Sequence, residues 1–285
     1  MRPEAVPILC DPASQEPLRL IEEAGGSWLV ATGSGRRFPL RDGIPRFLEE
    51  ADLDGENGRY QRLYDRMAAF YDLSTWLYAW VKGTGEEARR REYLRELGVR
   101  EGDRVLEVSV GTGANLPLLP SGAWYFGLDI SWGMLSRCRR RARRCGLNVD
   151  LFLGAAERLP FRSAVFDSVF HVGGINFFSD RRRALAEMVR VAKPGTRIVI
   201  VDETENFAAR HERTPFARAF YGRRPRRIEA PAEMLPVGMV DVQTHLVAGG
   251  DLYCLSFRTP RVVEPDSEPS APVAGGADHR DPHPA

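Results

Sequence analysis

The chain has 285 residues, enough for one large domain or for a large domain with a small companion. Its 40 Lys and Arg side chains nearly balance its 39 Asp and Glu side chains, which excludes a strong overall field favouring nucleic acid or a membrane surface. Apolar runs stay well short of the roughly 20 residues that span a membrane, and the first residues lack the apolar core of a signal peptide. These features predict a cytoplasmic protein without a membrane span.

Residues 1–50 are predicted to form a small unit rich in strands. Short apolar segments over 18–21, 27–30 and 37–40 are separated by glycine turns, which is the pattern of short β-strands. A unit of this size buries little core alone, so we expect it to pack on the larger domain. The acidic, polar stretch 52–56 is predicted to be a linker.

Helical spacing of apolar side chains follows, over residues 57–72, 74–81 and 86–97. The first stretch carries an aromatic stripe that is expected to be mostly core: Tyr60, Leu63, Tyr64, Met67 and Tyr71. The last helix is expected to end near Gly98 and to turn four side chains inward: Ala88, Tyr93, Leu94 and Leu97.

The segment 104–116 predicts a buried strand, a glycine turn at Gly111 and Gly113, and the start of a helix. A dinucleotide-binding turn would need a third glycine where the chain has Leu116, so a nicotinamide cofactor is disfavoured. Instead, Glu107 lies four residues before the first glycine, and Asp129 ends the next apolar run. A carboxylate can accept two hydroxyl donors or pair with a cation, so both acids are candidate ligand contacts.

This arrangement resembles class I S-adenosylmethionine-dependent methyltransferases. The resemblance implies that Gly111 and Gly113 face the methionine part of the cofactor, that Glu107 lies near its ammonium group, and that Asp129 takes the ribose hydroxyls. It implies S-adenosyl-L-methionine as the cofactor. Further cofactor contacts are then expected from Tyr71, Thr112, Asn115, Ile130, Ala156, Glu157, His171 and Val172.

The rest of the chain predicts the remaining strands and helices of that family. Helix 132–145 is expected to be capped by Ser131, strands are expected over 148–153, from 166 onward and over 197–203, and a helix over 181–192. Segments 240–247 and 251–257 alternate around a glycine turn and predict an antiparallel hairpin. The expected fold is therefore α/β, a doubly wound seven-stranded Rossmann-like sheet with a C-terminal antiparallel hairpin, plus the small N-terminal β-rich unit.

The expected domains are residues 1–50, a methyltransferase domain with an N-terminal helical lid over 51–260, and a disordered tail over 261–285, which is rich in Pro, Ser, Gly and Asp. The start and end of the first unit resemble the zinc-ribbon-like domain that activates some methyltransferases. Only Cys10 stands where zinc-binding members carry paired cysteines, and the other cysteines, Cys138, Cys145 and Cys254, are scattered. No metal site is predicted.

Residues 156–161 and the Tyr71-Asp72 pair resemble the quinone-methyltransferase branch, in which the segment before the glycine turn covers the pocket. Tyr64 and Tyr71 are candidates for that cover, and Tyr71 is also a candidate catalytic residue. His171 and Asn176 follow the fourth strand, at the ligand side of a doubly wound sheet. His171 is a candidate general base, with a purely structural role left open, and Asn176 could orient a carbonyl or hydroxyl of the substrate.

The predicted function is methyl transfer to carbon or oxygen of a small, partly apolar molecule, a quinone precursor or a secondary metabolite. Two alternatives stay open: an RNA methyltransferase, and a non-catalytic cofactor-binding scaffold or partner subunit. Helix 132–145 carries six arginines, which could meet RNA phosphates, although a solvated helix face is the favoured interpretation. The acceptor, any need for a base and the oligomeric state are left undecided.

Overall fold

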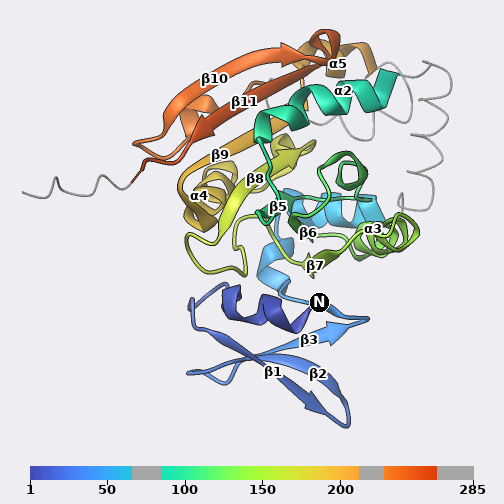
Figure 1. Ribbon diagram of the computed structural model, residues 1–285, viewed down its shortest axis with the longest axis vertical. Coiled ribbons are helices and arrows are strands. Elements are labelled where there is room, and N and C mark those ends of the chain that lie inside the picture. The colour runs from blue at the N-terminus through green and yellow to red at the C-terminus, as the bar shows by residue number, and fades with distance from the viewer. Residues whose placement is uncertain (66–84, 212–227, 262–285) are drawn as a thin grey trace, which may run out of the picture.

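A seven-stranded sheet forms the centre of the computed structural model, which describes residues 1–65, 85–211 and 228–261 (Figure 1). The strand order is β10-β11-β9-β8-β5-β6-β7. The five parallel strands are β5 (Arg104–Val108), β6 (Trp124–Asp129), β7 (Val149–Leu153), β8 (Phe166–Val172) and β9 (Ala192–Glu203). The antiparallel pair consists of β10 (Val240–Val247) and β11 (Leu252–Arg258), with β11 inserted beside β9. The predicted fold class and terminal hairpin are confirmed.

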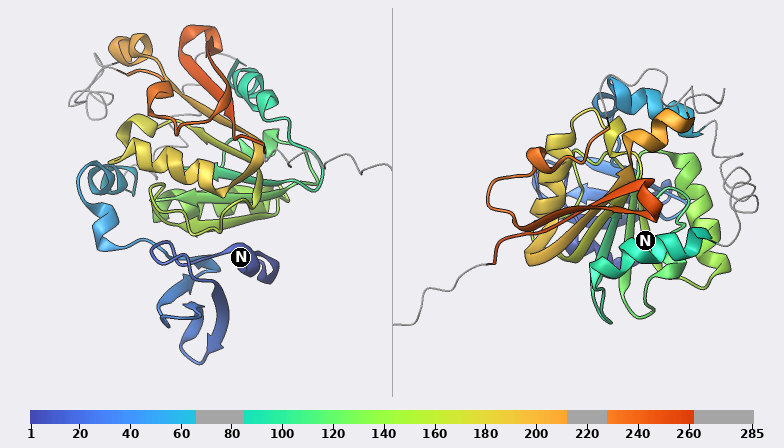
Figure 2. Two further views of the ribbon diagram at one scale, coloured as in Figure 1. Left: turned by 90° about the vertical axis from the view of Figure 1, so that its left-hand side faces the viewer. Right: turned by 90° about the horizontal axis from the view of Figure 1, so that it is seen from above.

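Helices cover both faces of this sheet, as Figure 2 shows. On one face, α4 (Arg181–Val191) and the N-terminal unit bury apolar side chains against the sheet. On the other face lie α2 (Gly85–Leu94) and α3 (Trp132–Arg144). The short α5 (Glu205–His211) follows β9. Because both faces are covered, the parallel strands can be almost continuously apolar, as in Ile198–Val201.

The connection from β5 to β6 contains no α-helix, which corrects the prediction of a helix starting after Gly113. Only a short 3-10 helix, η4 (Leu116–Leu118), forms there. Pro117 and Pro120 explain the difference, because a proline has no N–H to donate and its ring clashes with the preceding helical turn. The loop therefore stays open beside the ends of the strands.

The stretch expected to be a linker is ordered. Its first two residues are the end of the 3-10 helix η2 (Glu50–Leu53). Arg158 donates to Asp52 Oδ1 at 2.6 Å and, just before η2, to Glu49 Oε2 at 3.0 Å. Helical backbone follows over residues 56–65. Asp65 accepts a hydrogen bond from the Gly133 N–H at 3.0 Å, which joins this helical segment to the start of α3. Tyr71, Met67 and residues 74–81 lie outside the described residues.

The N-terminal unit is a four-stranded antiparallel sheet in the order β1-β2-β3-β4, preceded by the 3-10 helix η1 (Pro3–Ile8). Its strands are β1 (Leu18–Glu23), β2 (Gly26–Ala31), β3 (Arg37–Arg41) and β4 (Ile44–Pro45). The chain just after β4 pairs with the outer edge of β7, where the Phe47 N–H donates to the Leu153 carbonyl at 2.8 Å. Phe47 is buried in the core of that face. The unit thus covers one edge of the large sheet.

Helix α2 confirms most of its predicted inward face. Tyr93 and Leu94 are buried, as is Leu97 in the 3-10 helix η3 (Arg95–Leu97), and Gly98 ends the segment in a left-handed conformation. Ala88 is exposed, contrary to the prediction, because α2 contacts the sheet mainly through its last turn. Among the residues described, no helix combines the length and the apolar character needed to cross a bilayer.

Candidate functional site

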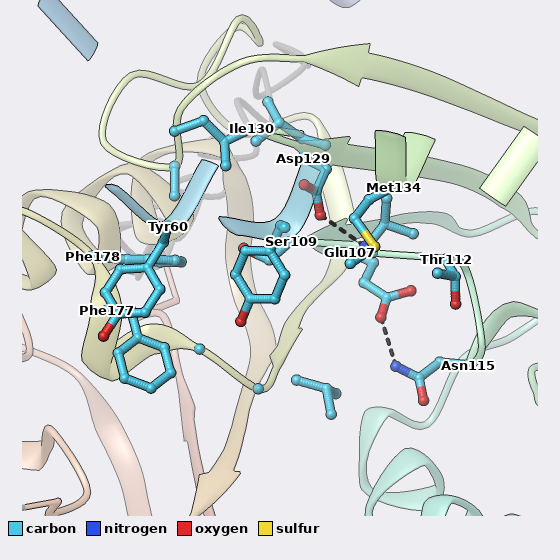
Figure 3. Close-up of a pocket in the computed structure, with 18 of the residues that line it drawn as sticks. Tyr60, Glu107, Ser109, Thr112, Asn115, Asp129, Ile130, Met134, Phe177 and Phe178 are labelled. Carbon is cyan, nitrogen blue, oxygen red and sulfur yellow. Dashed lines mark hydrogen bonds between the residues drawn. The ribbon is translucent and has the colours of Figure 1, made fainter. Parts of the chain in front are cut away.

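A cavity opens at the carboxyl ends of β5, β6 and β8 (Figure 3). Later strands are added on both sides of β5, and this switch point is where ligands bind in doubly wound sheets. The cavity brings together most of the residues predicted from the sequence. Those that line it are Glu107, Gly111, Thr112, Asn115, Asp129, Ile130, Ala156, Glu157 and Val172. Elements far apart in the chain therefore meet at one site.

Glu107 is buried at the end of β5, with 2% of its surface exposed. Its Oε1 accepts a hydrogen bond from Asn115 Nδ2 at 2.6 Å, whereas its Oε2 has no partner among the described residues. Burial raises the pKa of Glu107 to about 8, and the hydrogen bond from Asn115 offsets only part of that effect. A buried oxygen without a partner is costly, so a cationic donor entering the cavity would be favoured here.

Asp129 ends β6, and both of its carboxylate oxygens accept hydrogen bonds from nearby backbone N–H groups. The Gly111 N–H donates to Oδ2 at 2.8 Å and the Ser131 N–H donates to Oδ1 at 2.9 Å. Burial raises the pKa of Asp129 to about 6, and these backbone hydrogen bonds work in the opposite direction. Each oxygen has a second lone pair, so the carboxylate can still accept hydroxyl donors from a ligand.

The two glycines of the turn have different roles. Gly111 lines the cavity at a φ of +55°, and a β-carbon there would meet nothing closer than 4.0 Å. Gly113 does not line the cavity: a β-carbon on it would lie 2.6 Å from the Sγ of Cys138 in α3. Gly113 is thus required for packing of the turn on α3, and its expected contact with the ligand stays a prediction.

Arginines brace the turn from two helices. Arg90 of α2 lines the cavity and donates to Asn115 Oδ1 at 2.7 Å. Arg141 of α3 donates to the carbonyl oxygen and the hydroxyl of Thr112, both at 2.9 Å. The amide of Asn115 therefore links Arg90 to Glu107. One of the six arginines considered for RNA thus has a structural role in the turn.

The loop after β7 carries Ala156 and Glu157 to the wall of the cavity. Glu157 Oε1 accepts from Asn57 Nδ2 at 3.0 Å and from the Asp180 N–H at 3.3 Å. Asn57 also accepts a hydrogen bond from the Ser179 N–H at 3.0 Å. This wall is fixed by contacts between the helical segment 56–65 and the loop before α4.

An aromatic wall closes the cavity next to β8. The rings of Tyr60 and Phe177 stack with centroids 4.3 Å apart and planes 29° apart (Figure 3). Tyr64 and Phe178 also line the cavity. Tyr64 was predicted to cover the pocket, whereas the aromatic side chains after β8 were not singled out. Tyr71, the other predicted cover, is outside the described residues.

His171 and Asn176, the two predicted substrate-contacting residues of this region, do not line the cavity. His171 is fully buried; its Nδ1 lies 3.0 Å from the Val108 carbonyl, its ring packs edge-on against Phe178, and burial lowers its pKa. Asn176 donates to Asp202 Oδ2 at 2.9 Å and accepts from Arg181 at 3.1 Å. Side chains alternate along β8, so Val172 faces the cavity and His171 does not. The structure thus argues against His171 as a base that contacts substrate.

Comparison with known proteins identifies the family. Residues 106–200 match the methyltransferase domain family. Over 175 residues the chain is 35% identical to the demethylmenaquinone methyltransferase of Mycobacterium sp. (strain KMS), an alignment that covers 61% of this chain and 68% of that protein. The chain belongs to the S-adenosylmethionine-dependent methyltransferases. Its cofactor is S-adenosyl-L-methionine.

Solved structures share the fold of this methyltransferase. An S-adenosylmethionine-dependent methyltransferase from Thermotoga maritima aligns with a TM-score of 0.53 at 21% identity, covering 70% of this chain and 98% of its own. Phosphoethanolamine N-methyltransferase 2 of Haemonchus contortus, in complex with S-adenosyl-L-methionine, aligns with a TM-score of 0.55 at 15% identity, covering 85% and 71%. At these identities the likeness concerns the fold.

The cavity of the methyltransferase fits its cofactor chemically. S-adenosylmethionine carries a sulfonium and an ammonium group, and the open Oε2 of Glu107 is a suitable acceptor for a cationic donor. Several lining residues were missed in the sequence: Asn57, Tyr60, Arg90, Ser109, Phe177 and Phe178. Ser109 could have been found, because it lies between Glu107 and the first glycine, whereas Arg90 looks like any other arginine of an amphipathic helix.

Proposed function

We propose that this methyltransferase methylates a ring carbon of a small, partly apolar aromatic acceptor of the quinone-precursor type. The similarity to the Mycobacterium demethylmenaquinone methyltransferase carries the proposal. The aromatic wall of the cavity supports it, because Tyr60, Phe177 and Phe178 offer apolar ring surfaces against which a flat acceptor can pack. Methylation on oxygen of a secondary metabolite is the alternative, and a matched pair of acceptors distinguishes it from methylation on carbon.

In this proposal the two acids and the loop after β7 hold the cofactor. Glu107 accepts from its ammonium group, Asp129 accepts from the ribose hydroxyls, and Ala156 and Glu157 lie beside the adenine. When bound, the cofactor supplies a methyl group already activated on a sulfonium sulfur. The chain then has to align an acceptor carbon with that methyl group and keep water away, which is a proximity effect.

The proposal needs no protein base at the acceptor carbon. His171 is enclosed, Asp129 accepts from the glycine turn, and Glu157 accepts from Asn57. The third carboxylate of the cavity, Glu107, is assigned to the ammonium group of the cofactor. An acceptor whose ring hydroxyl ionises is nucleophilic at the adjacent carbon by itself. The new bond would form between that carbon and the methyl group as the bond from the methyl group to the sulfonium sulfur breaks, with the neutral thioether S-adenosylhomocysteine as the leaving group. The ring carbon then loses its proton to solvent as the ring regains its aromatic character.

A matched pair of acceptors tests the proposal. The protein is incubated with S-adenosylmethionine and a naphthoquinol that is unsubstituted at the carbon next to a hydroxyl, or with its analogue already methylated at that carbon. We expect a product heavier by one CH₂ from the first acceptor and none from the second, by mass spectrometry. Equal product from both acceptors would mean methylation on oxygen.

RNA methylation is the competing possibility, and a group of arginines on α3 is the observation behind it. Arg137, Arg140, Arg143 and Arg144 line a shallow hollow on the outer side of α3, where phosphates could bind. Bulk RNA from cells that lack this gene is therefore included in the assay. Strong labelling of RNA without labelling of the quinol would overturn the small-molecule proposal.

A further inference from the structure

Three potential metal ligands from distant parts of the chain converge on the face of the sheet that α2 covers. Glu96 lies in η3, directly after α2, whereas His245 and Cys254 lie on β10 and β11. His245 and Cys254 are directly opposite each other in the antiparallel pair, so their side chains project to the same face. Their separation along the chain explains why the sequence spacing gave no sign of a metal site.

The donor atoms are close to the separations that a tetrahedral metal ion imposes. His245 Nε2 lies 2.8 Å from Glu96 Oε1, Cys254 Sγ lies 3.5 Å from the same oxygen, and all three atoms lie within 4.8 Å of one another. Ordinary zinc–ligand bond lengths at tetrahedral angles place ligand atoms roughly 3.3–3.6 Å apart. Small side-chain adjustments would therefore suffice to admit an ion.

We propose that Glu96, His245 and Cys254 form a binding site for a divalent transition-metal ion, with Zn²⁺ as the natural candidate. One nitrogen, one oxygen and one sulfur donor form a set that suits zinc or cobalt rather than magnesium or calcium. Three protein ligands leave one position for water, unlike the four ligands of closed structural zinc sites. The Cys254 thiol distinguishes this site from a simple ion pair, because a pair of His245 and Glu96 would not require a sulfur atom beside it.

The residues around the three ligands leave an entry path for an ion and indicate which elements its binding would connect. The His245 side chain is 45% exposed and Cys254 is fully buried, so an ion would enter past the imidazole and meet the thiol at the floor of the site. Contacts already join α2 to the loop between β10 and β11: Arg89 to Asp251 at 3.0 Å, and the Ala248 N–H to Glu92 at 3.0 Å. A metal at Glu96 would add a further connection in η3, just beyond the C-terminal end of α2.

Cobalt is the probe, because Co²⁺ replaces zinc and reports on its ligands by absorbance. The full-length chain, treated with chelator and kept reduced, carries His279→Gln and His283→Gln, since histidines spaced by four can bind divalent ions. We expect binding of one Co²⁺ per chain, a near-ultraviolet thiolate-to-cobalt band, the intense visible bands of a four-coordinate ion, and their loss when Zn²⁺ is added. The thermal midpoint should rise with Zn²⁺ concentration.

Single substitutions locate the site. Cys254→Ser should abolish the near-ultraviolet band, and His245→Gln, at an exposed position, should weaken cobalt binding more than tenfold. Cys145→Ser, which removes an exposed thiol, is the matched control and should leave the spectrum unchanged. Weak binding with only the pale spectrum of a six-coordinate ion, or a thiolate band that survives Cys254→Ser, would overturn the proposal. Methyl transfer is not used as a readout, so failure here leaves the proposed function untouched.

Discussion

Glu107 and Asp129 are two buried carboxylates at the ends of neighbouring strands, yet the protein treats them differently. Both oxygens of Asp129 accept hydrogen bonds from backbone N–H groups, of Gly111 and Ser131. Within the part of the chain that the structure describes, Glu107 receives one hydrogen bond, from Asn115, and its second oxygen is buried without a partner. Burial accordingly raises the pKa of Glu107 to about 8 but that of Asp129 only to about 6.

This difference separates two ways of using an acid in a binding site. Asp129 holds the glycine turn to the start of α3 and can accept a ligand in addition, so it contributes to folding as well as to binding. Glu107 has an oxygen that finds no partner among the described residues and that a ligand donor can satisfy, which favours binding at the expense of the unliganded protein. Substitutions at the two positions should therefore have different signatures.

The largest effect is expected for Glu107→Gln. The amide keeps an oxygen for Asn115 but loses the negative charge, so affinity for S-adenosylmethionine should fall about 10- to 100-fold, as expected for a charge-assisted hydrogen bond worth about 1.5–3 kcal/mol. Titration calorimetry measures the affinity. Glu87→Gln, on the exposed side of α2, is the matched control and should bind normally.

The same variant should unfold at no lower temperature than the wild type near pH 7, because an acid with a pKa of about 8 is already mostly neutral there. A marked loss of thermal stability in Glu107→Gln would show that the carboxylate is structural after all. The contrast with Asp129 would then be wrong.

The next effect is a dependence of cofactor affinity on pH. Protonated Glu107 resembles glutamine, and its ionised fraction falls about 50-fold between pH 8 and pH 6. Lowering the pH over that range should therefore weaken binding by up to about 50-fold, and by no more than the substitution does. Binding should release protons, detectable by calorimetry in buffers of different ionisation enthalpy. Glu107→Gln should lose this component, which separates it from titration of the cofactor's own amino group; an identical pH profile in both proteins would contradict the assignment.

The stability of the unliganded protein should change with pH in the opposite direction to the cofactor affinity, so it should fall as the pH rises. The folded pKa of Glu107 lies above its usual value of 4.5, so its contribution is fully present at low pH and is lost as the pH rises through about 8. The difference in unfolding free energy between Glu107→Gln and the wild type should therefore grow in favour of the variant as the pH rises from about 4.5 to about 8, and should level off above that. Chemical denaturation at several pH values measures it.

Asp129→Asn should have smaller effects, and these should appear in both the stability of the protein and its affinity for the cofactor. Asparagine has one acceptor oxygen, so either the Gly111 or the Ser131 N–H loses its partner, which should cost about 1 kcal/mol of unfolding free energy. Affinity should fall about fivefold, because the turn is less well held and one ribose acceptor is lost. Weakened binding with unchanged stability would show that the two backbone hydrogen bonds contribute little to folding.

Local patterns were enough to predict the fold and the acids of this site. The apolar strands, the glycine turn, Ser131 as a helix cap and the terminal hairpin each depend on neighbouring residues, and the structure confirms them. The helix expected after Gly113 was wrong because Pro117 and Pro120 outweigh the family pattern. Residue type alone could therefore place Glu107 and Asp129, but could not say which of them has its oxygens satisfied.

What sequence reasoning missed depends on contacts between distant segments. His171 was chosen for its position after a strand, but alternation along β8 turns it away from the cavity. Arg90 and Phe177 reach the cavity only because α2 and the loop after β8 fold back over it. The meeting of Glu96, His245 and Cys254 needs the register of the terminal hairpin, which no local pattern specifies.

The smallest expected effect concerns Ser109, which lies two residues after Glu107 and two before Gly111, the residue whose N–H bonds to Asp129. Ser109 lines the cavity at a φ of +61°, a left-handed conformation that costs an L-residue roughly 1–2 kcal/mol. Glycine removes this strain but loses more chain entropy on folding, so Ser109→Gly should stabilise the protein by about 0.5–1 kcal/mol.

The affinity of Ser109→Gly then extends the contrast between the two acids. If the loop is held by the hydrogen bonds to Asp129, relieving the strain should change cofactor affinity less than threefold, because the positions of Gly111 and Glu107 persist. Ser109→Val, with a branched β-carbon that tolerates a left-handed φ poorly, is the opposite control and should destabilise the protein. A Ser109→Gly protein that is less stable than the wild type would show that the hydroxyl, rather than the backbone angle, governs this position.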